Sequence, residues 1–370
     1  MEGDFTVILC LEIDARTKAN LEELVRSGPY ADFSEAVSVA IANQLLLHRH
    51  ARQKGGSFIV PTNDPLIEGS KKPLTSIVAT NESKIPLIFS TTSELPEGTK
   101  LGALPGDSFV PGALVPVDRW IFGQHNKLLP IKASSRALAS MTIDSRGIPL
   151  TKAASDIASQ AVQLGDYLRE LDDKHRLSRD EALAVAFPIS QSDATDKARL
   201  RYANQFVGAV NKQGQLSGLL ADFKLVSLLP GKEPRIRLTE AGWNFAILEN
   251  PILDGRPAFT SRLGESEIRF LVEHIRSHVP AEDFAYRTIL NACSEGANTP
   301  ERLDEYLSKF VSPRQGSPFT PAFVSTQRSG AISRMSDLGL IARNRTGVKV
   351  TYVASESGGQ YVNNNIARTA

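Results

Sequence analysis

Apolar residues recur at helical spacing over most of this chain and alternate at strand spacing only in short runs. The helical spacing predicts helices over 130–141, 151–171, 179–187, 196–212, 265–278, 281–295, 299–307 and 325–338. Short apolar or alternating runs predict strands over 224–229, 235–239, 340–345 and 348–353. The pattern therefore predicts a mainly α fold with small β-hairpins.

The first fifty residues show a different order of elements. A strand-like run over 6–13 precedes two helix-like runs that are separated at 27–29. A segment this short cannot bury its own apolar face, so we expect two copies to pair their strands around a shared four-helix core. The side chains expected in this homodimer interface are Val7, Leu9, Leu11, Ile13, Val37 and Ile41.

The segment from Arg26 to Ala36 is similar to the segment of ribbon-helix-helix proteins that forms the turn between the two helices and the start of the second helix. In that family the paired ribbon enters the major groove of DNA. Here the strand face opposite the core offers Ile8, Cys10 and Glu12, which are poor partners for bases and phosphates. We therefore expect residues 1–50 to dimerise or bind a partner rather than to recognise sequence, and contact between the ribbon and DNA stays open.

Prolines are frequent in the next stretch of the chain. Eight of them lie between His48 and Pro116, among many Gly, Ser and Thr residues. This composition predicts a Pro/Gly-rich linker over 51–117. The alternative is a small irregular β region, because 57–60 and 74–79 have the composition of strands.

The composition is that of an ordinary globular protein, with 22% charged and 41% apolar residues. No run of about eighteen apolar residues occurs, and the acidic Glu2 and Asp4 are unlike the start of a secretory signal. We therefore expect no membrane association and a cytoplasmic, nucleoid-associated location. Cys10 and Cys293 are too few for a disulfide framework, and both are expected to be reduced.

The sequence shows no familiar catalytic motif. It has no phosphate-binding loop, no nucleophile elbow and no Cys pair at metal spacing. His274 and His278 are expected to be a surface pair rather than metal ligands, and Asp172 and Asp173 are expected to be solvated. A packed aromatic corner, rather than a ligand pocket, is expected from Trp120, Phe122 and His125. We therefore expect no catalytic residue, no metal, no cofactor and no enzymatic activity.

Two later stretches share a plan of helices followed by a two-stranded hairpin. The first stretch is 179–242. Its segment from Leu238 to Gly242 is similar to the segment that follows the wing of winged-helix domains and starts the next helix. Residues 197–237 hold eight basic and two acidic residues, a local net charge of +6. The resemblance and the charge predict DNA contacts from Lys197, Arg199, Arg201, Arg235 and Arg237.

The second stretch, 265–353, resembles a winged-helix domain in which the recognition helix, 325–338, runs into its wing. Residues 314–349 hold six basic residues and one acidic residue, a local net charge of +5, although the whole chain carries only +1. DNA contacts are predicted from Thr326, Gln327, Arg328 and Arg334 on the helix and from Arg343, Arg345 and Lys349 on the wing. The alternative for both basic stretches is a solvated face or a contact with the N-terminal module, because residues 1–50 hold eight acidic and four basic residues.

These observations divide the chain into a dimerisation module, a linker, two winged-helix-like domains and a flexible tail. The expected boundaries are 1–50, 51–117, 118–250, 251–356 and 357–370. We predict a dimeric protein of a prokaryote or virus that binds double-stranded DNA, as a transcriptional regulator or a DNA-organising factor. The alternative is a non-enzymatic scaffold or adaptor in a nucleoprotein or defence assembly, with the same modules contacting other proteins.

Overall fold

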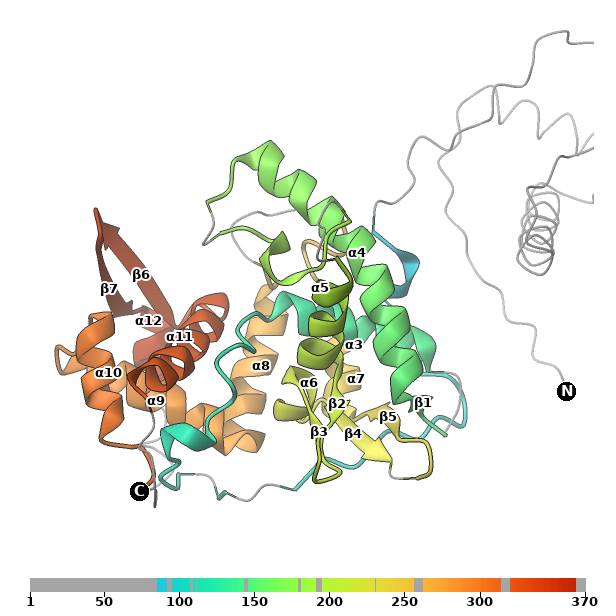
Figure 1. Cartoon of the computed structure of the whole chain (residues 1–370), viewed down its shortest axis with the longest axis horizontal. Coiled ribbons are helices and arrows are strands. Elements are labelled where there is room, and N and C mark those ends of the chain that lie inside the picture. Colours follow the sequence, from blue (N-terminus) through green and yellow to red (C-terminus); the bar gives the residue numbers. More distant parts are fainter. Residues whose placement is uncertain are drawn as a thin grey trace, which may run out of the picture. The chain divides into compact units, whose positions relative to one another are not determined.

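The structure, a computed structural model, describes residues 85–91, 95–106, 109–110, 112–142, 146–178, 181–190, 195–229, 231–255, 262–313 and 320–363. All of them belong to one compact unit, Ala79–Ala370. Helices dominate the described part, with three small antiparallel sheets between them, which confirms the predicted mainly α class with small β-hairpins (Figure 1). The predicted ribbon-helix-helix module and the 51–84 part of the predicted linker lie outside the described residues.

A three-stranded sheet organises the first half of the unit, in the order β1-β5-β4. Its strands are β1 (Ile148–Pro149), β4 (Val226–Leu229) and β5 (Arg235–Leu238). The helices around it are α3 (Leu129–Met141), α4 (Leu150–His175) and α7 (Glu240–Ile247). β1 pairs with β5 through Ile148 and Ile236, and α4 begins directly after β1. Thr239 is the N-cap of α7, and its Oγ1 accepts a hydrogen bond from the Gly242 N–H at 3.0 Å.

The stretch between α4 and β4 differs from its prediction. In place of the helix predicted over 179–187, the described residues contain only the short 3₁₀ helix η4 (Ala184–Ala186). The buried carboxylate of Asp172 accepts hydrogen bonds from the Leu183 and Ala184 N–H groups at 2.7 and 3.0 Å, and this holds the chain in a turn. Asp172 is therefore a structural acceptor, and its prediction as a solvated charge is wrong.

The helix predicted over 196–212 is also shorter than expected. It consists of α5 (Thr195–Tyr202) and a π-helical turn, η5 (Ala203–Val207). Gly208 ends it with φ +141°, a conformation that disfavours every residue with a side chain. The chain then forms the paired strands β2 (Ala209–Val210) and β3 (Leu216–Ser217) and the short helix α6 (Leu219–Asp222).

The second half of the unit follows the predicted order of helices and hairpin. It contains α8 (Glu265–His278), α9 (Pro280–Ser294), α10 (Pro300–Ser308), α11 (Pro321–Asp337), β6 (Ile341–Thr346), β7 (Lys349–Ala354) and α12 (Glu356–Asn363). Thr299 caps α10, because its hydroxyl accepts from the Arg302 N–H at 3.4 Å. A helix replaces the start of the predicted flexible tail: the α12 residue Tyr361 is buried and donates to Asp283 at 2.7 Å.

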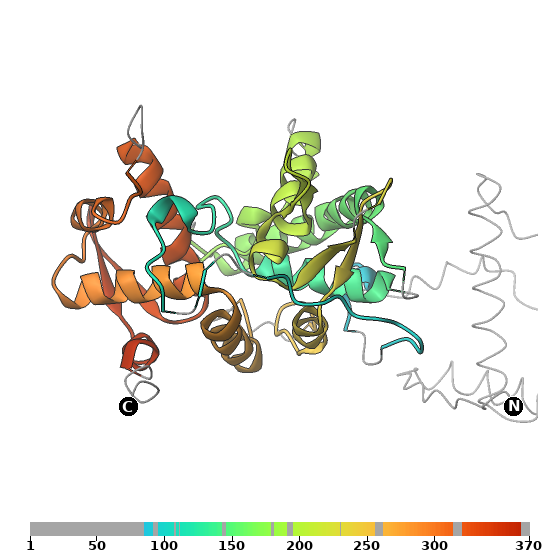
Figure 2. The ribbon, with the colours of Figure 1, turned by 90° about the horizontal axis from the view of Figure 1, so that it is seen from below.

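The described residues of 85–117 run along the body rather than away from it. Figures 1 and 2 show this segment crossing from the neighbourhood of α3 to that of α9 and α10. Phe89, Val115 and Val117 are buried, and the Val117 N–H donates to the Phe310 carbonyl at 3.0 Å. This part of the predicted linker therefore belongs to the folded body.

One hydrophobic core runs through both halves of the unit. It continues across the expected domain boundary near residue 250, where Ile252, Leu253 and Leu263 are buried. Arg262 links the two halves, because its Nη2 donates to the Ala182 carbonyl at 3.3 Å while its Nη1 forms an ion pair with Asp337 at 2.6 Å. The regions 118–250 and 251–356 thus pack as one body. None of the described helices is both long enough and apolar enough to cross a membrane.

Candidate nucleic-acid interface

The hairpin β6–β7 carries the exposed basic residues of the second predicted site. Its residues 342–349 are all exposed, and the strands extend away from the neighbouring helices (Figure 1). The hairpin contains Arg343, Arg345 and Lys349 and no acidic residue. In the ladder Arg345 pairs with Val350 and Thr346 with Lys349, so the two arginines share one face and Lys349 lies on the other. The hairpin therefore presents positive charge in more than one direction.

The base of the hairpin is fixed to the body. Tyr352 is buried, and its N–H donates to the Asn298 carbonyl at 2.8 Å. Arg328 donates to the Tyr352 hydroxyl at 3.3 Å and pairs with Asp304 at 2.7 Å. Arg328 is only 5% exposed. It therefore acts as a brace between α10, α11 and the hairpin, and its predicted DNA contact is wrong.

Arg334 and Gln327 also point inward rather than toward solvent. Arg334 is 0% exposed and forms a two-pronged ion pair with Glu282, at 2.6 Å from Nε and 2.9 Å from Nη2. Burial alone would lower the pKa of Arg334, but the adjacent Glu282 carboxylate more than offsets this and raises that pKa above its usual value. Gln327 is 2% exposed. The predicted DNA contacts of Arg334 and Gln327 are therefore wrong.

The inward face of α11 holds the connection that leads into α3. The Gln327 Oε1 accepts from the Gly123 N–H at 2.6 Å, and Arg334 donates to the His125 carbonyl at 2.6 Å. The Asp337 carboxylate accepts from the Leu128 N–H at 3.1 Å. Three polar side chains at helical spacing thus clamp the 123–128 segment onto α11.

This clamp requires close approach of two backbones at Gly123 and Gly330. A Cβ at Gly330 would lie 2.3 Å from the Gly123 oxygen, and a Cβ at Gly123 would lie 2.0 Å from the Thr326 oxygen. These contacts are with backbone atoms, so a side chain cannot swing away to relieve them.

Gly330→Ala is therefore expected to destabilise the unit by about 1–3 kcal/mol, as measured by denaturant unfolding. The matched control is Gly359→Ala in α12, where an added Cβ would meet nothing within 4 Å. That control should be neutral or stabilising by up to about 1 kcal/mol, because alanine favours a helix more than glycine does. Equal stability of both variants would show that α11 and the 123–128 segment are not in close contact.

The first predicted basic group separates into two places. Lys197 and Arg201 lie exposed on α5, where Arg199 donates to Asp196 at 3.3 Å. Arg235 and Arg237 instead lie on β5 and line a groove of about 420 Å³ beside the three-stranded sheet. Some of the hydrogen-bond donors of Arg235 are already used within the protein, because its guanidinium donates to the Gly147 carbonyl at 2.9 Å.

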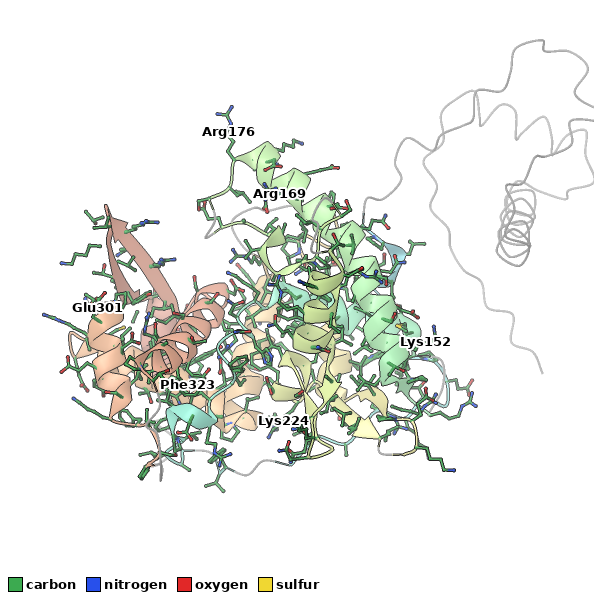
Figure 3. The ribbon with its side chains drawn as sticks, in the orientation of Figure 1. Lys152, Arg169, Arg176, Lys224, Glu301 and Phe323 are labelled. Carbon is green, nitrogen blue, oxygen red and sulfur yellow. The ribbon has the colours of Figure 1, made fainter. Side chains whose placement is uncertain are left out.

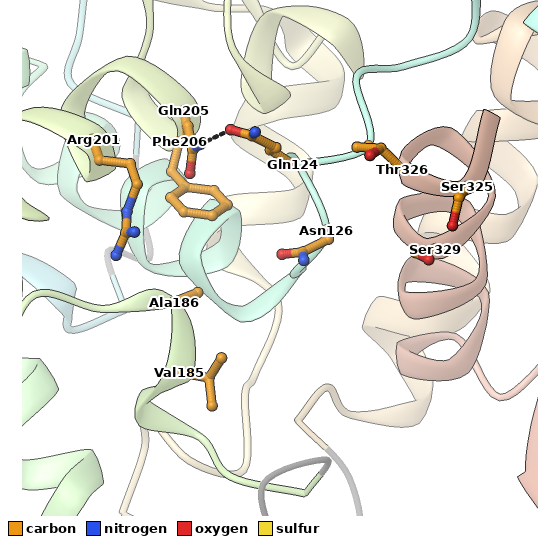
Figure 4. A pocket seen from close by; sticks show the side chains of 11 residues that line it. Gln124, Asn126, Val185, Ala186, Arg201, Gln205, Phe206, Ser325, Thr326 and Ser329 are labelled. Atoms are coloured by element: carbon orange, nitrogen blue, oxygen red, sulfur yellow. Dashed lines mark hydrogen bonds between the residues drawn. The ribbon is translucent and has the colours of Figure 1, made fainter. Parts of the chain in front are cut away.

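A polar cleft brings together residues from both predicted sites. It has a volume of about 500 Å³, and its walls are η4, the end of α5 with η5, and the first half of α11. The 123–126 segment forms its floor, as Figure 4 shows for Gln124 and Asn126. Its polar side chains are Gln124, Asn126, Arg201, Gln205, Ser325, Thr326 and Ser329. Arg201 and Thr326, both predicted to contact DNA, thus face one cavity, and the amides and serines around them were not predicted.

Other candidate groups have structural partners. His274 is buried and lies 2.7 Å from the Phe223 carbonyl through Nε2, so its prediction as a surface residue is wrong; burial lowers its pKa. Of the predicted aromatic corner, the structure shows a buried Trp120 and an edge-to-face contact between the Phe122 and His125 rings, but Phe122 is 44% exposed. Cys293 is free, and burial raises its pKa to about 11. Among the described residues, no group of three or more His, Cys, Asp and Glu side chains is placed to hold a metal ion.

Comparisons with protein-family models, with curated proteins and with solved structures found no match for this chain.

Proposed function

We propose that this chain is a dimeric protein that binds double-stranded DNA and acts as a transcriptional regulator or a DNA-organising factor. The observation that carries the proposal is the β6–β7 hairpin, which is exposed, contains three basic residues and has no acidic residue. Cations on a projecting hairpin suit the regularly spaced phosphates of a duplex. Dimerisation is assigned to residues 1–50 on the pattern of their sequence.

The order of elements supports the same proposal. α9, α10 and α11 are followed directly by the hairpin, an arrangement similar to that of winged-helix domains. In the first half, β1 precedes a helix and pairs with the second strand of the hairpin β4–β5. The inward-facing side chains of α11 change the expected contact: we assign the phosphate contact mainly to the hairpin and not to Gln327, Arg328 or Arg334.

The test is the salt dependence of binding of the full chain to a labelled random-sequence duplex, followed by fluorescence anisotropy. If each of three hairpin cations neutralises one phosphate, log Kd should change with log salt by a slope of about 3 per chain. A dimer using both hairpins should give a slope of about 5. Absence of binding at low salt would overturn the proposal and favour the adaptor function.

A further inference from the structure

We propose that the polar cleft between α5, η5 and α11 binds a nucleoside phosphate. In this proposal Arg201 contacts the phosphate, and the side-chain amides of Gln124 and Asn126 contact the base. This site is separate from the hairpin and does not depend on duplex binding.

Arg201 differs from the paired arginines of the same unit. Arg136, Arg262 and Arg334 each have a carboxylate within 2.6 Å. Arg201 has no ion pair and no hydrogen bond with any described residue, although it lines the cleft. A guanidinium in that state offers all five of its N–H donors, and it binds phosphate oxygens in a two-pronged geometry.

The charge of the cleft favours an anion. No Asp or Glu is among its lining residues, so nothing described in the wall repels a phosphate or competes with it for Arg201. A site that binds an acidic peptide would need more than one positively charged side chain. Here one arginine stands among uncharged hydrogen-bonding groups, which suits a ligand with one anionic end and one neutral polar end.

The neutral groups of the cleft have free hydrogen-bonding capacity. The side chains of Asn126 and Ser329 form no hydrogen bond with any described residue. Gln124 uses its Oε1 to accept from Gln205 at 3.4 Å, which leaves its amide N–H groups available (Figure 4). Side-chain amides present a donor and an acceptor side by side, and this pair matches the edge of a nucleobase.

An apolar surface lies beside these polar groups. Val185, Ala186 and Phe206 line the cleft on the same side as Arg201 (Figure 4). The flat face of a base can rest on such a surface while its edge reaches the amides. The volume of about 500 Å³ lies within the range of small-ligand sites.

The floor of the cleft is held in place before any ligand arrives. The Gly123 N–H donates to Gln327, and the His125 carbonyl accepts from Arg334. These contacts fix the backbone on both sides of Gln124. A fixed backbone lowers the entropic cost of ordering the site on binding.

The experiment is isothermal titration of the full chain with the four deoxynucleoside monophosphates, inorganic phosphate and single-stranded trinucleotides. We expect one saturable site per chain for at least one nucleotide. Arg201→Gln should weaken that binding by about tenfold or more, because it removes a charged hydrogen bond. The control, Lys197→Gln, changes an exposed residue of the same helix that does not line the cleft, and it should bind like the wild type.

Asn126→Ala should reduce the difference in affinity between nucleotides with different bases, while leaving the phosphate contact in place.

Binding of trinucleotides but not of mononucleotides, with the same dependence on Arg201, would support the site and identify a nucleic-acid strand as the source of the bound nucleotide. Equal affinity for inorganic phosphate and nucleotides would overturn the proposal, and so would nucleotide binding that Arg201→Gln leaves unchanged. The hairpin variant Arg343→Gln/Arg345→Gln/Lys349→Gln should keep nucleotide binding, so failure of duplex binding and failure of this site are distinguishable.

Discussion

Arg334→Gln is expected to lower the free energy of unfolding by about 3–5 kcal/mol. Both partners of the Arg334–Glu282 ion pair are fully buried, so removal of the guanidinium leaves a carboxylate without its counter-charge. The His125 carbonyl loses its donor at the same time. The expected measurement is a fall in the thermal unfolding midpoint on the order of 10 °C, with a matching loss in denaturant stability.

Two further variants separate a structural role from a DNA contact. Arg343→Gln removes the same charge from the exposed hairpin, and it should change stability by no more than about 0.5 kcal/mol. The double variant Arg334→Met/Glu282→Leu removes both buried charges and should recover much of the lost stability, because paired apolar residues can replace a buried ion pair. If Arg334→Gln keeps wild-type stability and loses only DNA affinity, then Arg334 faces the nucleic acid and not Glu282.

Local sequence signals predicted the elements of the second half well. The helix predicted over 299–307 corresponds to α10, and the apolar spacing of 265–278 and 281–295 matches α8 and α9. The strands predicted over 340–345 and 348–353 correspond, within one residue, to β6 and β7 of the hairpin. These features depend on neighbours in sequence, so a single chain contains the information needed to predict them.

The direction of polar side chains on α11 could not be predicted in this way. On this helix buried apolar residues such as Met335 alternate with buried polar ones such as Gln327, so no polar face stands out. Gln327 is buried because Gly123, 204 positions away, supplies a backbone N–H for it. Hydrogen bonds between residues that are far apart in the sequence produce no periodic pattern from which they could be predicted. The arginines of α11 were therefore predicted to lie on a solvent-facing side of the helix. In the structure Arg328 and Arg334 are buried and form ion pairs within the protein.

The cleft shows the same limit for a binding site. Arg201 and Thr326 were each singled out, but for contacts with a duplex and in separate domains. Their common cavity exists because the two halves share one core and because the 123–126 segment passes between them. The polar residues of that segment lie in a stretch without repeats or motifs, and only the tertiary contact gives them a role.

The triple variant Arg343→Gln/Arg345→Gln/Lys349→Gln is expected to abolish most duplex binding by the full chain. At about 0.9 counterions per phosphate contact, loss of three contacts should reduce the salt slope by nearly 3 per chain. At low salt the affinity should fall by about a hundredfold or more. The side chains are exposed and lie outside the hydrophobic core, so thermal stability should stay close to that of the wild type.

The matched control removes three exposed positive charges elsewhere, with Lys100→Gln, Arg119→Gln and Arg269→Gln. It changes the net charge by the same amount, so it separates a local contact from a general electrostatic effect. Exposed basic residues are also present at the end of α4, where Arg169 and Arg176 point outward in Figure 3. If the hairpin variant and the control lose affinity equally, binding follows overall charge and the hairpin has no special role. If the hairpin variant keeps the wild-type slope but no longer binds a protein partner, the hairpin is a protein-contact surface and the adaptor function is favoured.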